Sequence, residues 1–196
     1  MSHRTETSLT QELKSHILIL GSIVALLWII EIIDFFVFGG ALNRLGIRPR
    51  YIQGLDGIFF APFLHGNFHH LTANTLPLIT LGWFVMLRGV KDFFTVTFIT
   101  MIVSGLGVWL FASPYTIHIG ASGVIFGYLG FLLLRGFFER SFVSIVLSLL
   151  VGWLYGGLLW GVLPLQYGIS WQGHLFGLIG GVFAAQILAK SYRTKA

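Results

Sequence analysis

The chain of 196 residues contains no cysteine, and charged residues make up only 10% of it. The absence of cysteine excludes disulfides and thiolate metal sites. With 56% hydrophobic residues and a mean hydropathy of +0.86, the composition lies outside the range of soluble globular domains. The net charge of +5 comes from residues at the ends of apolar stretches, not from a basic stripe with interleaved aromatic residues, so it does not indicate nucleic-acid binding. The sequence therefore predicts a polytopic membrane protein.

Six apolar runs of about 20 residues are long enough to cross a bilayer as helices. They comprise residues 17–38, 68–87, 93–112, 122–138, 142–160 and 172–189. The first run is too long for a cleavable signal peptide and is followed by no small-residue cleavage site. The connections are short except for residues 39–67, which leaves no room for a second domain. We therefore expect residues 1–196 to form one all-α domain, a bundle of six transmembrane helices in the lipid bilayer.

Basic residues predict the orientation of these spans. With a cytoplasmic N-terminus, only Arg44, Arg48 and Arg50 fall on the outer side. The nine other lysines and arginines fall on the inner side, and they are Arg4, Lys14, Arg88, Lys91, Arg135, Arg140, Lys190, Arg193 and Lys195. An even number of spans returns the C-terminus to the cytoplasm. We expect a multi-pass protein of the plasma membrane with both termini cytoplasmic.

Four polar residues are predicted to share one layer near the outer face of the membrane. The second, fourth and sixth spans all run inward from that face. His70 and Asn74 lie one turn into the second span, Ser122 opens the fourth, and His174 lies near the start of the sixth. Polar side chains within a bilayer are costly unless they find partners, so such a group indicates a functional site.

Glycines would allow the fourth and sixth spans to approach closely. The fourth carries Gly123, Gly127 and Gly130, and the sixth carries Gly173, Gly177 and Gly181. These small-xxx-small patterns are typical of membrane helices that pack backbone to backbone. His174 shares one helical face with Gly177 and Gly181, so it can reach a helix packed on those glycines.

The four polar residues can supply the parts that peptide hydrolysis needs, which are a nucleophile, a base and donors for the oxyanion. Ser122 and His174 fit the first two roles, and His70 and Asn74, spaced i and i+4, share one helical face. No Asp or Glu lies on the outer side of the last three spans, which favours a Ser-His dyad over a triad. Taken singly, Ser122 could bond its own helix backbone and His174 could be an interhelical hydrogen-bonding group.

Three segments occur in an order and spacing that together resemble a known family. They are residues 65–74 (HGNFHHLTAN), 120–123 (GASG) and 173–181 (GHLFGLIGG). Over almost the whole chain this pattern is similar to the rhomboid family of intramembrane serine proteases. The resemblance implies a six-helix core and cleavage of transmembrane protein substrates near the outer membrane boundary. No cofactor is expected, and His65, His69 and His70 lack a nearby carboxylate or cysteine that would complete a metal site.

The resemblance also implies roles for individual residues. Ser122 is the expected nucleophile and His174 the expected general base. The oxyanion hole is expected to consist of His70, Asn74 and the backbone N–H of Ser122, with Gly120 shaping the loop beside it.

Other positions match the family less closely. Phe126 stands where the family often has a tyrosine packed on the catalytic histidine, so it offers stacking without a hydroxyl. Residues 56–62 stand where family members often carry a Trp-Arg pair, which puts the anchoring of that loop in doubt. His65 matches a structural histidine, whereas His69 has no counterpart. His118 is expected to be solvated or to form a hydrogen bond within its loop.

Three functions remain open from the sequence. The first is an intramembrane serine endopeptidase, and the second is a catalytically silent relative that acts as a membrane scaffold or chaperone. The third, a transporter or channel, would show internal repeats and polar groups at several depths, which are not found. For the protease, residues 161–171 are a candidate gate above the site. Trp153 and Trp160 of the fifth span would either line a seam through which substrate enters or anchor the span in the interface.

Overall fold

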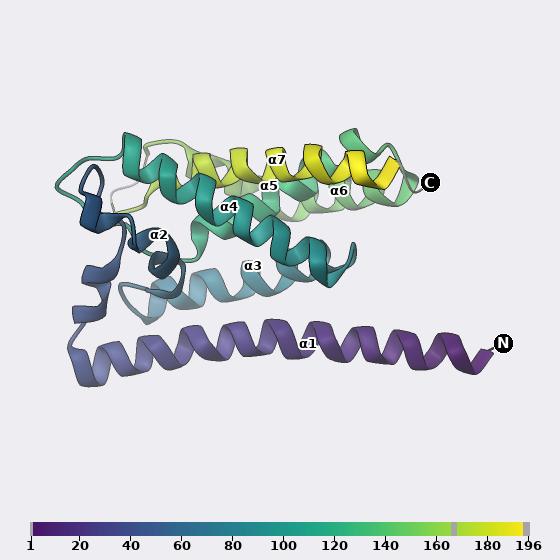
Figure 1. The fold of residues 1–196 in the computed structure, drawn as a ribbon, viewed down its shortest axis with the longest axis horizontal. Coiled ribbons are helices and arrows are strands. Elements are labelled where there is room, and N and C mark those ends of the chain that lie inside the picture. Colours follow the sequence, from purple (N-terminus) through teal and green to yellow (C-terminus); the bar gives the residue numbers. More distant parts are fainter. Residues whose placement is uncertain (1, 166–167, 194–196) are drawn as a thin grey trace.

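The computed structural model describes residues 2–165 and 168–193. These residues form seven α-helices and no β-strand, and one isolated bridge pairs Ile47 with His118. The helices are α1 (Ser2–Ile33), α2 (Gly57–Phe60), α3 (Phe68–Met86), α4 (Val90–Phe111), α5 (Ser122–Glu139), α6 (Phe142–Tyr155) and α7 (Trp171–Arg193). Helix α2 is a single turn in the long loop after α1, and the six others form one bundle (Figure 1). The predicted all-α fold is confirmed.

Among the described residues, five helical segments are long and apolar enough to cross a membrane. They are Leu9–Phe38, Val90–Phe111, Ser122–Glu139, Phe142–Val162 and Trp171–Lys190. The remaining predicted span is α3, which is 19 residues long but less apolar because its first turns hold His69, His70 and Asn74. It lies along the bundle, packed against α1 and α5 (Figure 1). The chain is therefore a multi-pass membrane protein, in which five of the six predicted spans have the length and apolarity of a membrane-crossing helix within the described residues and α3 does not.

Two predicted spans differ from the helices at their ends. The first was expected to begin at residue 17, but α1 begins at Ser2, because the polar residues before the apolar run contain no glycine or proline and continue the helix. The fifth was expected to reach residue 160 as one helix. Instead α6 ends at Tyr155 and continues as a 3₁₀ helix over Gly156–Val162, where two consecutive glycines disfavour the α-helix.

Helix α5 lies at the centre of the bundle and packs most extensively against α7. A Cβ atom on Gly181 would lie 1.8 Å from the backbone oxygen of Gly127, and one on Gly177 would lie 2.1 Å from that of Gly123. No side chain fits at such distances. The glycine patterns of the two helices therefore meet backbone to backbone, as the sequence predicts.

Buried ion pairs tie the helices together at the end that holds both termini (Figure 1). Arg88 Nε lies 2.5 Å from Asp92 Oδ2, and Arg135 Nε lies 2.8 Å from Glu139 Oε2. Arg88 also pairs with Glu139 and donates to the backbone oxygen of Leu188 at 2.7 Å. A buried charge is costly without a partner, and here each carboxylate faces a guanidinium group. The cluster joins the ends of α3, α4, α5 and α7.

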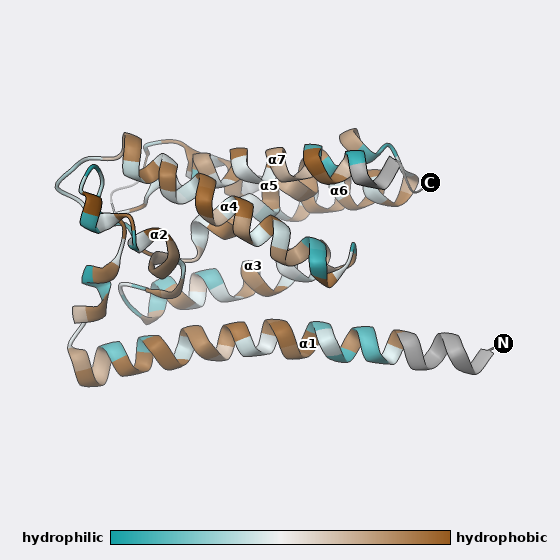
Figure 2. Ribbon diagram, in the orientation of Figure 1, coloured by the Kyte–Doolittle hydropathy of each residue, from teal (hydrophilic) through white to brown (hydrophobic). Residues whose placement is uncertain are grey.

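Many large apolar residues of α1, α4 and α6 are exposed. The hydropathy colouring of the ribbon in Figure 2 shows the apolar character of α1 and α4. Trp153 and Trp160 are among the most exposed, at 81% and 71%. So many exposed apolar residues suit contact with lipid chains rather than with water. Both tryptophan side chains project away from the bundle, which favours the role of lipid-facing anchors over that of residues lining an internal seam.

We expect Gly181→Ala to destabilise the protein, because the new methyl group would overlap the backbone oxygen of Gly127 and force α5 and α7 apart. Overpacking of this kind costs about 1–3 kcal/mol, and the melting temperature in detergent should fall accordingly. Gly21→Ala is the matched control, since nothing lies within 4 Å of its Cβ position in α1. A melting temperature for Gly181→Ala equal to that of the control would contradict the close helix contact.

Candidate active site

Ser122 is the first residue of α5, and the loop before it is firmly anchored. Gly120 has φ of +113°, and its N–H donates to the oxygen of Ala61 at 2.8 Å. The N–H of Ala121 donates to His65 Nε2 at 3.5 Å. As the first residue of a helix, Ser122 has a backbone N–H that the helix ladder does not use. The loop thus fixes the backbone at Ser122, including its amide.

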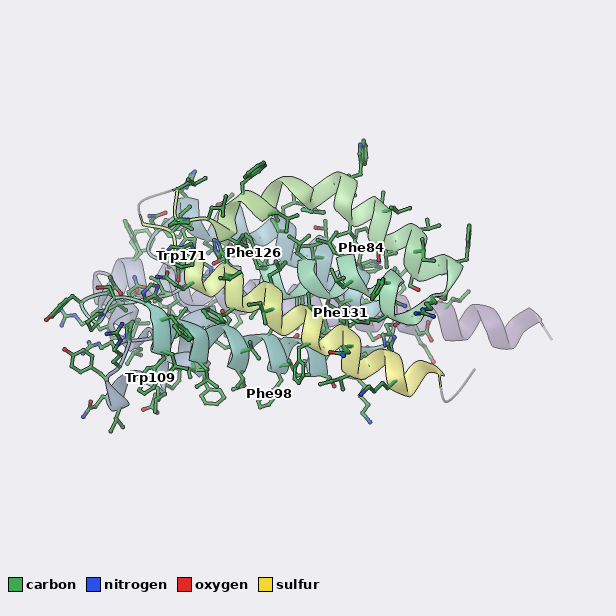
Figure 3. The ribbon with its side chains drawn as sticks, turned by 90° about the horizontal axis from the view of Figure 1, so that it is seen from above. Phe84, Phe98, Trp109, Phe126, Phe131 and Trp171 are labelled. Atoms are coloured by element: carbon green, nitrogen blue, oxygen red, sulfur yellow. The ribbon has the colours of Figure 1, made fainter. Side chains whose placement is uncertain are left out.

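His174 lies in the first turn of α7 and is buried, with 7% of its surface exposed. Its Nδ1 lies 2.8 Å from the backbone oxygen of Gly161. A carbonyl oxygen only accepts, so in the neutral ring Nδ1 carries the proton and Nε2 keeps its lone pair. The ring of Phe126 stacks on the imidazole with centroids 4.0 Å apart and planes at 6°, near the start of α7 (Figure 3). Both the orientation and the tautomer of the His174 ring are therefore fixed.

The first turns of α5 and α7 lie against each other. A Cβ atom on Gly123 would lie 3.4 Å from the oxygen of Gly173, which accepts a hydrogen bond of 2.8 Å from Ser104 Oγ of α4. Ser122 precedes Gly123 and His174 follows Gly173, so both lie at the same end of this interface. Within the described residues no hydrogen bond joins Ser122 to His174. In enzymes, hydrogen bonds between catalytic groups are often long in the absence of substrate and become shorter when substrate binds.

Helix α3 brings His70 and Asn74 beside the same loop. A Cβ atom on Gly120 would lie 2.7 Å from His70 Cε1, 2.8 Å from His70 Nε2 and 3.7 Å from Asn74 Nδ2. Asn74 is 7% exposed, and its buried Nδ2 has no hydrogen-bond partner among the described residues. Buried donors are nearly always paired, so this one is suited to an acceptor that arrives with a ligand. Asn67 caps α3 by accepting from the N–H of His70 at 2.8 Å.

One protein family matches most of this chain. The model of the Rhomboid domain matches residues 53–191, which include Ser122, His174, His70 and Asn74. The chain belongs to the rhomboid family. Its similarity extends to proteins of several organisms.

Two of these relatives are uncharacterized mycobacterial proteins. The protein of Mycobacterium bovis is 44% identical over 97% of this chain and 84% of its own length. That of Mycobacterium leprae is 43% identical over 87% of this chain and 70% of its own length. Rhomboid protease GluP of Bacillus subtilis is 34% identical over 77% of this chain and 29% of its own length.

Two loop histidines of this rhomboid are uncharged at neutral pH. Burial, and to a smaller extent the neighbouring His70, lowers the pKa of His65 from 6.5 to about 3. Burial also lowers the pKa of His118, whose two ring nitrogens both form hydrogen bonds. His69 is exposed. In the part of the chain that the structure describes, no three potential ligands converge on a metal site.

Some groups at the site carry no sequence signal. Gly161 acts through its backbone oxygen, which no side-chain pattern reveals. Ser170, by contrast, precedes α7 as an N-cap, and a serine before an apolar run is a recognisable helix start. The candidate gate over residues 161–171 includes positions 166 and 167, which lie outside the described residues.

The lowered pKa of His65 predicts a loss of stability in acid. In the unfolded chain His65 binds a proton near pH 6.5, whereas in the folded chain it does so only near pH 3. The contribution of His65 to the free energy of unfolding is therefore fully present above pH 6.5 and is lost as the pH falls toward 3. At pH 5 the loss from this residue is about 2 kcal/mol. We expect His65→Gln, which keeps an acceptor for the N–H of Ala121, to flatten the dependence of the melting temperature on pH between 7 and 4. A slope equal to that of the wild type would contradict the burial of a neutral His65.

Proposed function

We propose that this rhomboid is an intramembrane serine endopeptidase with Ser122 as nucleophile and His174 as general base. The observation that carries the proposal is the hydrogen bond from His174 Nδ1 to the oxygen of Gly161, which leaves Nε2 unprotonated at the helix end where Ser122 lies. The stacked ring of Phe126 supports it, because it restricts rotation of the imidazole.

In the proposed reaction, Ser122 Oγ attacks the carbonyl carbon of a substrate peptide bond while His174 Nε2 takes the hydroxyl proton. The tetrahedral intermediate collapses, the C–N bond breaks, and His174 gives the proton to the leaving amine. Water then attacks the acyl-enzyme, with His174 taking its proton and returning it to Ser122 Oγ. The new carboxyl end of the substrate is released, and the enzyme is restored.

The negative oxygen of the intermediate needs hydrogen-bond donors that are already in place. Three donors are proposed, namely Asn74 Nδ2, His70 Nε2 and the N–H of Ser122. The proposal is supported by the proximity of both side chains to Gly120 and by the unpaired state of Asn74 Nδ2. With three donors, the loss of one side chain leaves two.

The proposed substrates are transmembrane segments of membrane proteins. A helix hides its peptide bonds in its own ladder, so a segment that is cut has to unwind locally. The resemblance to the family favours a small residue just before the cut. With the distribution of basic residues described above, the site lies near the outer face of the plasma membrane, and both termini are cytoplasmic.

We expect Ser122→Ala and His174→Ala each to abolish cleavage of a single-span substrate by the purified protein, and the double variant to be no worse than either, because the two act as one unit. Ser15→Ala, in the polar part of α1 far from the site, should cleave like the wild type. Activity of Ser122→Ala at the wild-type rate would rule out the serine protease. No cleavage by the wild type of any single-span substrate tested would favour the silent scaffold.

The oxyanion donors predict a graded effect. Removal of one donor in serine proteases costs about 10²–10³ in turnover, so Asn74→Ala or His70→Ala should lower kcat strongly without eliminating it. His69→Ala is the matched control, because that side chain is exposed on the same turn of α3. If kcat were the same in all three variants, α3 would have no part in the reaction.

A further inference from the structure

His118 and Ser170 connect the loop before α5 to the residue before α7. His118 Nδ1 lies 2.7 Å from Ser170 Oγ. The same oxygen accepts a hydrogen bond of 3.2 Å from the N–H of Gly173 and so caps α7. His118 precedes Ser122 by four positions, and Ser170 precedes His174 by four. One side-chain contact thus couples the two segments that carry the proposed dyad.

The proton positions in this contact follow from the neighbouring groups. The hydroxyl of Thr116 donates to the oxygen of Ser113 at 2.6 Å, so toward His118 Nε2, 2.8 Å away, it can only accept. Nε2 of the neutral ring therefore carries the proton, and Nδ1 accepts from Ser170 Oγ–H. The backbone of His118 is fixed as well, since it exchanges hydrogen bonds of 2.9 and 3.0 Å with Ile47.

Ser170 passes this constraint on to His174. Its backbone oxygen accepts the N–H of His174 at 3.1 Å, so a shift of Ser170 moves the backbone of the base. On the other side, His118, Ser170 and Ser122 line the same small cavity of about 40 Å³. The contact therefore lies next to the nucleophile without occupying the position of a reacting group.

We propose that His118 is a positioning residue for the dyad. Through Ser170 it fixes the start of α7 against the loop that leads to Ser122, and so sets the separation of Ser122 Oγ from His174 Nε2. The proposal rests on the proposed function. The reaction rate of a nucleophile and its base falls steeply when they are displaced by a fraction of an ångström. We therefore expect kcat to fall about tenfold when the contact between His118 and Ser170 is removed.

The test uses the full-length protein in detergent and measures two quantities. The first is kcat and KM on a single-span substrate. The second is the rate constant and final extent of Ser122 labelling by a fluorophosphonate probe, which reacts with the serine without substrate recognition. The rate constant reports the geometry of the dyad in folded molecules, whereas the final extent reports how many molecules are folded.

We expect His118→Leu to lower kcat and the labelling rate constant together by about tenfold, with KM little changed. His118→Asn should restore most of both, because its amide oxygen can accept from Ser170 in place of Nδ1. Thr116→Ala is the matched control, since it removes the partner of Nε2 and leaves the contact with Ser170 in place. If His118→Leu fails to fold, the contact is tested at Ser170 instead. Ser170→Ala removes the hydroxyl that bonds His118, and Ser170→Thr keeps a hydroxyl and should retain most of the activity.

The outcomes separate the two proposals. A His118→Leu variant whose labelling rate constant equals that of the wild type, even with a lower final extent, overturns the positioning role and leaves the protease intact. Equal loss in His118→Asn and His118→Leu overturns it too, because the acceptor then makes no difference. A wild type that labels no faster than Ser122→Ala overturns the proposed function, and the positioning role with it.

Discussion

The close contact between the backbones of α5 and α7 is the constraint on which the rest of the site depends. In a bilayer no hydrophobic force drives helices together, so packing and small residues decide which helices touch. Gly177 and Gly181 bring α7 to within reach of the backbone oxygens of Gly123 and Gly127. Ser122 and His174 lie at one end of this contact. At the opposite end the buried ion pairs around Arg88 hold the same helices, so the interface is fixed at both ends.

The imidazole of His174 is oriented without a carboxylate. A carboxylate at this depth would be expensive unless paired, whereas a backbone oxygen carries only a partial charge. The oxygen of Gly161 sets the tautomer, and the ring of Phe126 limits rotation. The backbone oxygen stabilises a protonated imidazole less than a carboxylate would. In return it places no additional charge among apolar helices.

Much of this architecture can be predicted from the sequence, because membrane spans and glycine contacts follow simple patterns. The apolar runs predict the bundle, and the inward direction of three spans predicts that Ser122, His174, His70 and Asn74 approach one another. The apolar run does not predict the N-terminal part of α1, because it begins only at residue 17, although the polar residues before it also favour a helix.

Other features depend on how the loops fold. The oxygen of Gly161 belongs to the backbone, and the contact of His118 with Ser170 spans 52 positions of sequence. Neither contact belongs to a periodic sequence pattern. Each forms only because the packed helices bring two distant segments of the chain together. The roles of the site residues are still predictions, whereas their proximity is a property of the structure.

The position of Gly161 ties the orientation of His174 to the segment that follows α6. It lies in the 3₁₀ segment that continues α6, directly after Trp160, whose side chain is 71% exposed. A displacement of this segment would stretch the hydrogen bond from His174 Nδ1 to the oxygen of Gly161, so the orientation of the buried imidazole depends on the position of one lipid-facing segment.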